Sequence, residues 1–136
     1  MERTNQQYDS VIDSCRSVFS QKMNDYGTAW RILRPKSLTD QIYIKASRIR
    51  SIEEKGVSKV KEGIRPEFIG IVNYAVMGLI QLELGPSETE LDKEKTLEYY
   101  NKYFQTAKAL MQDKNHDYGE AWRKMRISSY TDLILM

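Results

Sequence analysis

The motif Asp-Tyr-Gly-x-Ala-Trp-Arg occurs twice in the chain, at residues 25–31 and 117–123. Its residue types suit a ligand, because an aromatic side chain stacks on a nucleobase and a guanidinium group binds phosphate. The same types also suit a structural corner, in which glycine ends a helix, the aromatic side chains pack on the core and arginine pairs with aspartate. The motif by itself leaves both interpretations open.

Four basic residues lie within or soon after the first motif at helical spacing: Arg31, Arg34, Lys45 and Arg48. A separation of three residues places the first two on one side of a helical turn. One hypothesis is that all four converge on a single anion pocket beside Asp25 or Asp40, whose carboxylates orient them or hold a magnesium ion. The alternative is a solvated basic face.

These residues, with their repeated counterparts, form two predicted ligand sites. The first consists of Asp25, Tyr26, Trp30, Arg31, Arg34, Asp40, Lys45, Arg48 and Asn73. The second is a half-site of Asp117, Tyr118, Trp122, Arg123, Arg126 and Asp132. Asn73 belongs to the first site because it places an amide in a very apolar segment. A buried amide must be hydrogen-bonded, either to a neighbouring helix or to a ligand.

The motif is part of a longer internal repeat. Residues 22–42 and 114–134 are identical at 12 of 21 positions, at a constant offset of 92 residues. Trp30 and Trp122 are equivalent, and we expect each to pack beside the tyrosine of its own motif. A full second unit would extend to about residue 184. We therefore expect a fragment of a longer protein, with units at 1–86 and 87–136 in one compact domain.

Hydrophobic periodicity predicts an all-α helical bundle. Helices are expected at about residues 5–24, 37–55, 66–84 and 94–113, with a fifth from residue 129. Ser37-x-x-Asp40 resembles a capping box at the start of the second helix. The third helix is apolar nearly all round, which predicts that it forms the buried centre of the bundle.

Composition excludes several classes of protein. The chain has 136 residues, of which 40% are hydrophobic and 29% charged, as expected for one globular domain. No apolar run approaches the roughly 18 residues of a membrane span, and the N-terminus lacks the apolar stretch of a signal peptide. One cysteine excludes an internal disulfide and favours the cytoplasm. A net charge of +2 predicts no strong nucleic-acid footprint.

Carboxylates for metal-dependent hydrolysis form an incomplete pattern. An α-helical nucleotide pyrophosphatase needs several carboxylates on facing helices, typically Glu-Glu-x-x-Glu followed by Glu-x-x-Asp. Glu53-Glu54 stands at the predicted end of the second helix, and Glu67-x-x-Gly70 lacks the second acid. If such an enzyme is nevertheless present, Asp40 and Glu67 are among the expected magnesium ligands.

Three segments together resemble one bacterial and phage family: KxxDYGxAWRxxRxxSxTDxI, Lys45-x-x-Arg48-Ile49, and Glu67 to Ala75. The family is the nucleotide modification associated domain, type 1. The resemblance implies an association with nucleotide or DNA-base modification, without an assigned reaction. Longer bacterial members carry two units, and the chain resembles such a duplicated member with its second copy truncated. Phage members often carry an acid where this sequence has Gly70, so the departure argues against hydrolysis by the first unit.

Three functions follow as alternatives. The leading one is a helical protein that binds a nucleotide or a phosphorylated small molecule in a modification process. The second is a divergent magnesium-dependent nucleoside triphosphate pyrophosphatase, and the third is a non-catalytic helical interaction module. We also expect a homodimer, because the chain ends on four apolar residues, 133–136, and exposed apolar surface tends to find a partner.

Overall fold

The computed structural model describes residues 2–56 and 63–136, which form five α-helices and two short 3₁₀ turns. The helices are α1 (Glu2–Tyr26), α2 (Pro35–Lys55), α3 (Arg65–Leu84), α4 (Lys93–Tyr118) and α5 (Ile127–Leu135). The 3₁₀ turns are η1 (Ala29–Ile32) and η2 (Ala121–Lys124). Since the described part of the chain contains no strand, the all-α prediction is confirmed.

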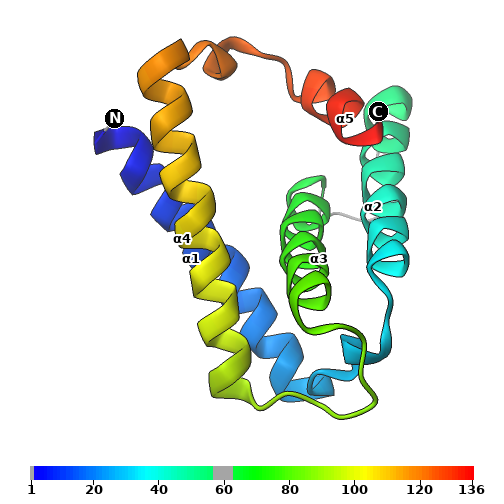
Figure 1. Ribbon diagram of the computed structural model, residues 1–136. Helices are drawn as coiled ribbons and strands as arrows, with labels where there is room; N and C mark the ends of the chain where they lie inside the picture. The colour runs from blue at the N-terminus through cyan, green and yellow to red at the C-terminus, as the bar shows by residue number, and fades with distance from the viewer. Residues whose placement is uncertain (1, 57–62) are drawn as a thin grey trace.

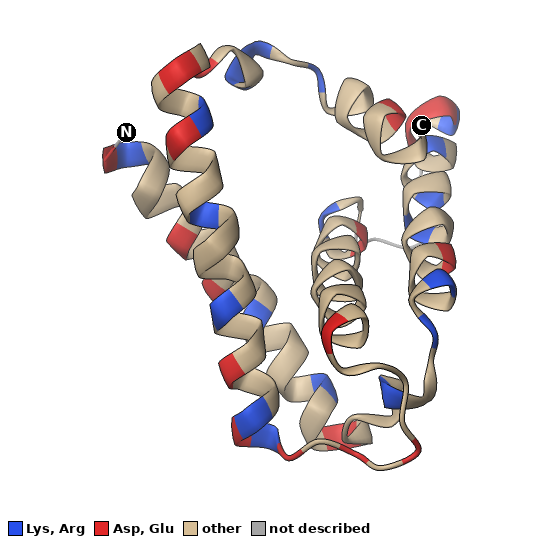
Figure 2. Ribbon diagram, in the orientation of Figure 1, with Lys and Arg blue, Asp and Glu red and all other residues tan. Residues whose placement is uncertain are grey.

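The helices surround α3 on two sides (Figure 1). On one side lie α1 and α4, which run antiparallel to each other, and on the other side lies α2. The short α5 packs on the C-terminal half of α2, so the connection that contains η2 bridges from the end of α4 across to α2. Basic and acidic residues both occur along α2 and α4, whereas the linker between α3 and α4 is mainly acidic (Figure 2).

Two apolar clusters hold α3 in place. The first joins α1, α3 and α4 through Ile12, Phe19, Met23, Val76 and Tyr100. The second joins α2 and α3 through Ala46, Ile49 and Ile71, with the partly buried Leu135 of α5 packed against it. Because α3 contributes to both clusters, it is the central helix, as predicted.

α3 is the central helix, but the described helices leave part of its apolar surface uncovered. Leu79 and Leu82 expose 43% and 70% of their surface, since the described helices contact α3 on two sides only. By length and composition, α3 is also the one described helix that meets the criteria for crossing a membrane. Its polar residues Glu67, Asn73 and Gln81 are nevertheless buried within the protein, which is the arrangement of a core helix.

Several helix boundaries differ from the predicted ones. α2 begins at Pro35 and not at Ser37, because proline fits the first helical position; no side chain caps the helix, and the predicted capping box is wrong. α5 likewise begins directly after Arg126. α1 and α4 are longer than expected at both ends, and the Asp92 side chain caps α4 by accepting a 2.8 Å hydrogen bond from the backbone N–H of Lys95. Residues 57–62, between the predicted second and third helices, lie outside the described residues.

Both copies of the motif form the same corner. Gly27 and Gly119 have φ of +64° and +71°, which glycine adopts without a steric penalty. Each donates its backbone N–H to the carbonyl four residues earlier, at 2.8 Å, and closes the preceding helix. A 3₁₀ turn, an extended arginine and a new helix then follow in both copies. The local chain path is therefore the same in the two units.

Candidate functional site

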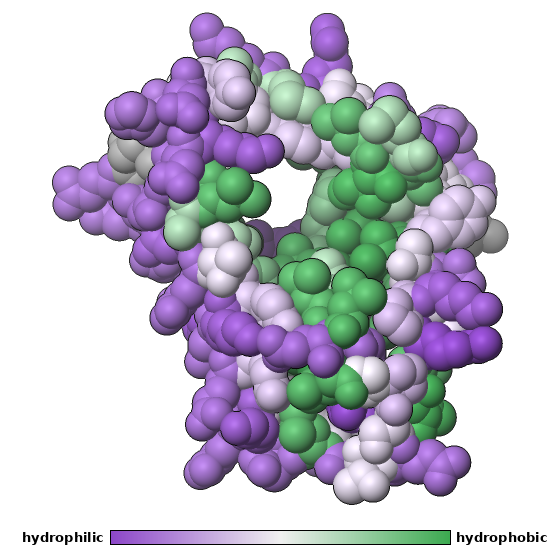
Figure 3. Space-filling view, in the orientation of Figure 1, coloured by the Kyte–Doolittle hydropathy of each residue, from purple (hydrophilic) through white to green (hydrophobic). Residues whose placement is uncertain are grey.

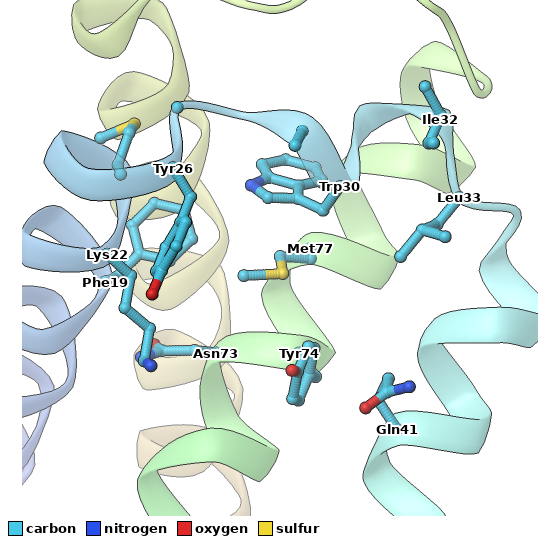
Figure 4. Close-up of a pocket in the computed structure, with 13 residues that line it drawn as sticks. Phe19, Lys22, Tyr26, Trp30, Ile32, Leu33, Gln41, Asn73, Tyr74 and Met77 are labelled. Atoms are coloured by element: carbon cyan, nitrogen blue, oxygen red, sulfur yellow. The ribbon is translucent and has the colours of Figure 1, made fainter.

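A cavity of about 430 Å³ opens beside Trp30, between α1, η1, α2 and α3 (Figure 4). Most of its wall is apolar or aromatic. The lining side chains include Phe19, Lys22, Tyr26, Trp30, Ile32, Leu33, Gln41, Asn73, Tyr74 and Met77.

Aromatic rings from three elements face this cavity. Trp30 of η1 is partly buried, with its ring centroid 6.5 Å from that of Phe19 on α1. Tyr26, the last residue of α1, stands at the rim with 72% of its surface exposed. Tyr74 enters from α3, on the side of Gln41 (Figure 4). Flat aromatic faces around an apolar space suit a planar ring ligand.

Lys22 supplies the positive charge at this cavity. It lies one helical turn before Tyr26 on α1, so the two side chains share one face of the helix. An ammonium group beside a ring-binding space is suited to the phosphate of a bound nucleotide, to which it donates up to three hydrogen bonds. Gln41 of α2 adds an amide that both donates and accepts.

Arg31 holds the wall of the cavity in place and does not line it. The residue is 6% exposed, and its guanidinium donates to the side-chain oxygen of Gln81 and, at 2.9 Å, to the carbonyl of Gly85. The amide of Gln81 donates in return to the carbonyls of Arg31 and Leu33, at 2.7 and 2.6 Å. The end of α3 and η1 are therefore tied by a buried polar network.

The acidic linker fastens the same turn from outside. The Glu90 carboxylate accepts a 2.7 Å hydrogen bond from the backbone N–H of Thr28. The Thr28 hydroxyl donates to the carbonyl of Leu91 and accepts from its N–H, at 3.1 and 2.9 Å. Ser87 donates its N–H to the carbonyl of Arg31 at 2.8 Å. The corner that carries Trp30 is thus fixed by both ends of the linker.

Asn73 connects three helices at the floor of the cavity. Its amide nitrogen donates to the carbonyl of Cys15 on α1 at 3.0 Å, and its oxygen accepts from the hydroxyl of Tyr100 on α4 at 2.8 Å. Burial raises the pKa of the Tyr100 phenol well above its ordinary value, although the Arg16 guanidinium over its ring acts in the opposite direction. The structure therefore shows the helix-linking role that the sequence left open for Asn73.

Lys45 and Arg48 lie at the other end of α3. Both pair with the buried Glu67 carboxylate, with nitrogen-to-oxygen distances of 3.3 and 3.4 Å. Glu67 lies in the first turn of α3 and the Arg31 partner Gln81 in its last, so about 21 Å of helix separates the two groups. The predicted convergence of the basic residues on one pocket is wrong, because α2 runs along α3 and carries Lys45 and Arg48 away from η1.

The remaining predicted residues of the first site lie on the surface. Arg34 and Asp40 are exposed near the start of α2, and Asp25 is exposed on α1, where it accepts a 3.4 Å hydrogen bond from Gln21. Three predicted site residues line the cavity: Tyr26, Trp30 and Asn73.

The second unit forms only part of an equivalent site. A shallower hollow lies along the C-terminal half of α4 and η2, lined by Ala107, Leu110, Met111, Lys114, Asn115 and Trp122. Trp122 is 36% exposed; its indole N–H donates to Asn115 at 2.9 Å, and the Arg123 guanidinium lies 4.8 Å from the indole centroid. Trp30 and Trp122 therefore occupy equivalent turns but different surroundings.

The other half-site residues point elsewhere. Arg123 pairs with Glu120 at 2.5 Å, and Asp132 pairs with Arg50 of α2 at 2.7 Å. Tyr118 is 80% exposed. Asp117 and Arg126 are also on the surface. Of the predicted half-site, Trp122 alone lines the hollow.

Some residues of the cavity were not predicted as site residues: Lys22, Gln41, Tyr74 and Met77. Lys22 carried a signal, since it is identical in both repeats. Gln81 carried the same signal as Asn73, a lone amide in an apolar helix. Tyr74 and Met77 carried none, because an aromatic or a methionine at helical spacing is ordinary core.

Magnesium does not fit the residues that are present. The described residues contain no group of three or more His, Cys, Asp or Glu side chains placed to hold a metal ion. The Glu67 carboxylate faces Lys45 and Arg48, and Asp40 is exposed at the start of α2. Cations beside Glu67 already neutralise the charge that a metal ligand needs.

The fold and the site define an all-α domain built on the central apolar helix α3. Two helices, α1 and α2, pack on α3 and are joined by the glycine corner that carries Trp30. The model of the family nucleotide modification associated domain 1 matches residues 22–82 and 114–136, more than half of the chain. The chain therefore belongs to this family. The second match covers the positions that correspond to residues 22–44 of the first. No curated protein and no solved structure matches the chain.

Proposed function

We propose that the chain binds a nucleotide in the cavity beside Trp30, with the base among Trp30, Tyr26 and Tyr74 and the phosphate at Lys22. The observation that carries the proposal is the position of this cavity. Apart from Phe19, every residue that lines it falls within the family match at residues 22–82. The family name refers to nucleotide modification, and a nucleotide is a ligand that needs both an aromatic face and a cation.

The size and polarity of the cavity support the same class of ligand. A volume of about 430 Å³ lies within the range of small-molecule sites. Its apolar wall favours burial of a ring, while Gln41 offers a donor and an acceptor to the edge of a base. Arg31 contributes indirectly, because its buried bonds to Gln81 and Gly85 hold the turn on which Trp30 stands.

Thermal unfolding with a panel of nucleosides, nucleoside monophosphates and nucleoside triphosphates tests the proposal. A ligand at 100 times its dissociation constant stabilises the folded state by about 2.7 kcal/mol, which raises the melting temperature measurably. We expect phosphorylated members of the panel to raise it more than the nucleosides. A panel in which no compound shifts the melting temperature would contradict the proposal.

A matched pair of variants locates the binding. Lys22 lines the cavity and Lys114 is its counterpart in the second unit. Lys22→Ala is expected to weaken the binding of phosphorylated ligands about tenfold, while Lys114→Ala leaves it unchanged. Equal effects of the two substitutions would place the ligand elsewhere.

A further inference from the structure

The second unit exposes residues whose counterparts in the first unit are more deeply buried. Ala107 is exposed on α4, while its counterpart Cys15 on α1 is 1% exposed and bonds α3 through Asn73. Leu110 is 55% exposed, while its counterpart Val18 is half-buried. The hollow formed by α4 and η2 in the second unit therefore corresponds to the surface of α1 and η1 against which α3 packs in the first unit.

Polar groups along this hollow also lack partners of the kind that α3 supplies in the first unit. The side-chain nitrogen of Asn115 is buried and lacks a hydrogen-bond partner in the structure. In the first unit, Gln81 of α3 donates to the carbonyls of Arg31 in η1 and of Leu33 directly after it. The corresponding residues in and directly after η2 are Arg123 and Met125, and both are exposed.

An opening marks the same place in the molecule. It passes through the structure below the connection between α4 and α5 (Figure 3). The ribbon in the same orientation shows α4 on one side of it, α5 and α2 on the other, and α3 below (Figure 1). In the first unit, α3 fills the corresponding place between α1 and α2.

We propose that the face formed by α4, η2 and α5 is a docking site for one helix of the α3 type, supplied from outside these 136 residues. Like α3, such a helix is about 20 residues long and apolar. It carries an amide side chain near its middle, which faces α4, and a glutamine near its C-terminal end. The amide would meet the backbone beside Ala107, as Asn73 meets Cys15, and the glutamine would bind η2, as Gln81 binds η1.

Stoichiometry argues against a second copy as the source of this helix. Each chain presents two faces of this kind and carries one α3, which already fills the first. An exchange of α3 between two copies would empty one face for each one it fills. The helix therefore comes from another polypeptide segment, and it would also complete the wall opposite Trp122.

The test adds a peptide of residues 64–85, flanked by added lysines for solubility, to the full chain carrying Trp30→Phe. Trp122 is then the only tryptophan, and it lies in the proposed face. We expect a one-to-one complex in sedimentation equilibrium and a shift of Trp122 emission to shorter wavelength on burial. A Gln81→Ala peptide is expected to bind at least about tenfold more weakly.

A variant of the chain makes the result specific. Ala107 is exposed in the free chain, so Ala107→Arg places a long charged side chain on this face and is expected to leave the melting temperature of the free chain unchanged. It should abolish peptide binding and the emission shift. Peptide binding that survives Ala107→Arg, or that leaves Trp122 emission unchanged, would overturn the proposal. So would a chain that self-associates through this face and excludes the peptide, since a second copy would then be the occupant.

Discussion

The two units share a corner but differ in what covers it. Arg31 and Arg123 are the last residues of the two copies of the motif and follow the same glycine turn. Arg31 is buried against Gln81 and Gly85, whereas Arg123 pairs with Glu120 and reaches Thr4 and Gln7 on α1. The path of the backbone is therefore set by local sequence, and the environment of the side chains is set by α3.

This difference also separates a complete cavity from an open hollow. In the first unit, α3 contributes Asn73, Tyr74 and Met77 to the wall opposite Trp30. In the second unit, the wall consists of α4 and η2 residues only. A ligand that needs to be enclosed on both sides is therefore expected in the first unit.

Replacing the equivalent arginines should give the largest contrast. Arg31→Ala leaves Gln81 and the Gly85 carbonyl without their buried partner, and we expect it to lower the free energy of unfolding by about 3 kcal/mol. Arg123→Ala removes a partly exposed ion pair with Glu120 and the hydrogen bonds to Thr4 and Gln7, and we expect it to cost only about 1 kcal/mol. Urea unfolding of both variants measures the difference. Equal losses would show that the two corners are equally covered.

The equivalent glycines offer a second contrast. A Cβ atom at Gly27 would lie 2.3 Å from Glu90 Oε1, whereas a Cβ atom at Gly119 meets nothing within 4 Å. Both alanine variants incur about 1–2 kcal/mol of left-handed backbone strain. Gly27→Ala should lose about 1 kcal/mol more, because Glu90 must move and its bond to Thr28 is lost. Thermal unfolding at neutral pH compares the two, and a larger loss for Gly119→Ala would contradict the account.

A smaller effect concerns Tyr100 of α4, whose hydroxyl donates a hydrogen bond to Asn73 of α3 and so connects α3 to the second unit. The buried Tyr100 phenol has a pKa raised above 10, so above that pH it stays protonated in the folded chain while it ionises in the unfolded chain. The unfolded state then binds fewer protons, and stability falls as pH rises, by up to about 1.4 kcal/mol per pH unit.

Tyr100→Phe supplies the control for that pH dependence. It removes the hydrogen bond to Asn73 and should cost about 1 kcal/mol at neutral pH. It should also flatten the decline of the unfolding free energy above pH 10. Tyr8 and Tyr103, whose pKa values burial also raises, retain their own contributions in this variant. An unchanged slope would mean that Tyr100 does not supply the linkage.

Sequence reasoning recovered the helices and the corner because both are determined locally. Periodicity defined α1 to α4, and Gly27 indicated the left-handed turn. It misplaced the start of α2, because the serine pattern at Ser37 outweighed the simpler preference of Pro35 for a first helical position. This error arose because two local sequence patterns predicted different starts for the same helix.

The site was harder to predict because its assembly depends on distant contacts. Arg31 and Lys45 looked alike in sequence, yet α3 contacts one through Gln81 at its end and the other through Glu67 at its start. The direction in which α3 runs beside α2 determines which of these residues meets which end of α3, and this direction cannot be predicted from a local sequence pattern. Trp30 was found because the repeat marked it, while Tyr74 had no repeated partner within the chain.

The central claim is that the first unit, and not the second, encloses a nucleotide. Fluorescence titration with the nucleotide that gives the largest thermal shift tests it most directly, in chains that keep one tryptophan each. With Trp122→Phe, the remaining Trp30 lies in the cavity, and its emission should change and saturate as the ligand binds. With Trp30→Phe, the remaining Trp122 should not respond. A saturating response from Trp122, with none from Trp30, would contradict the account.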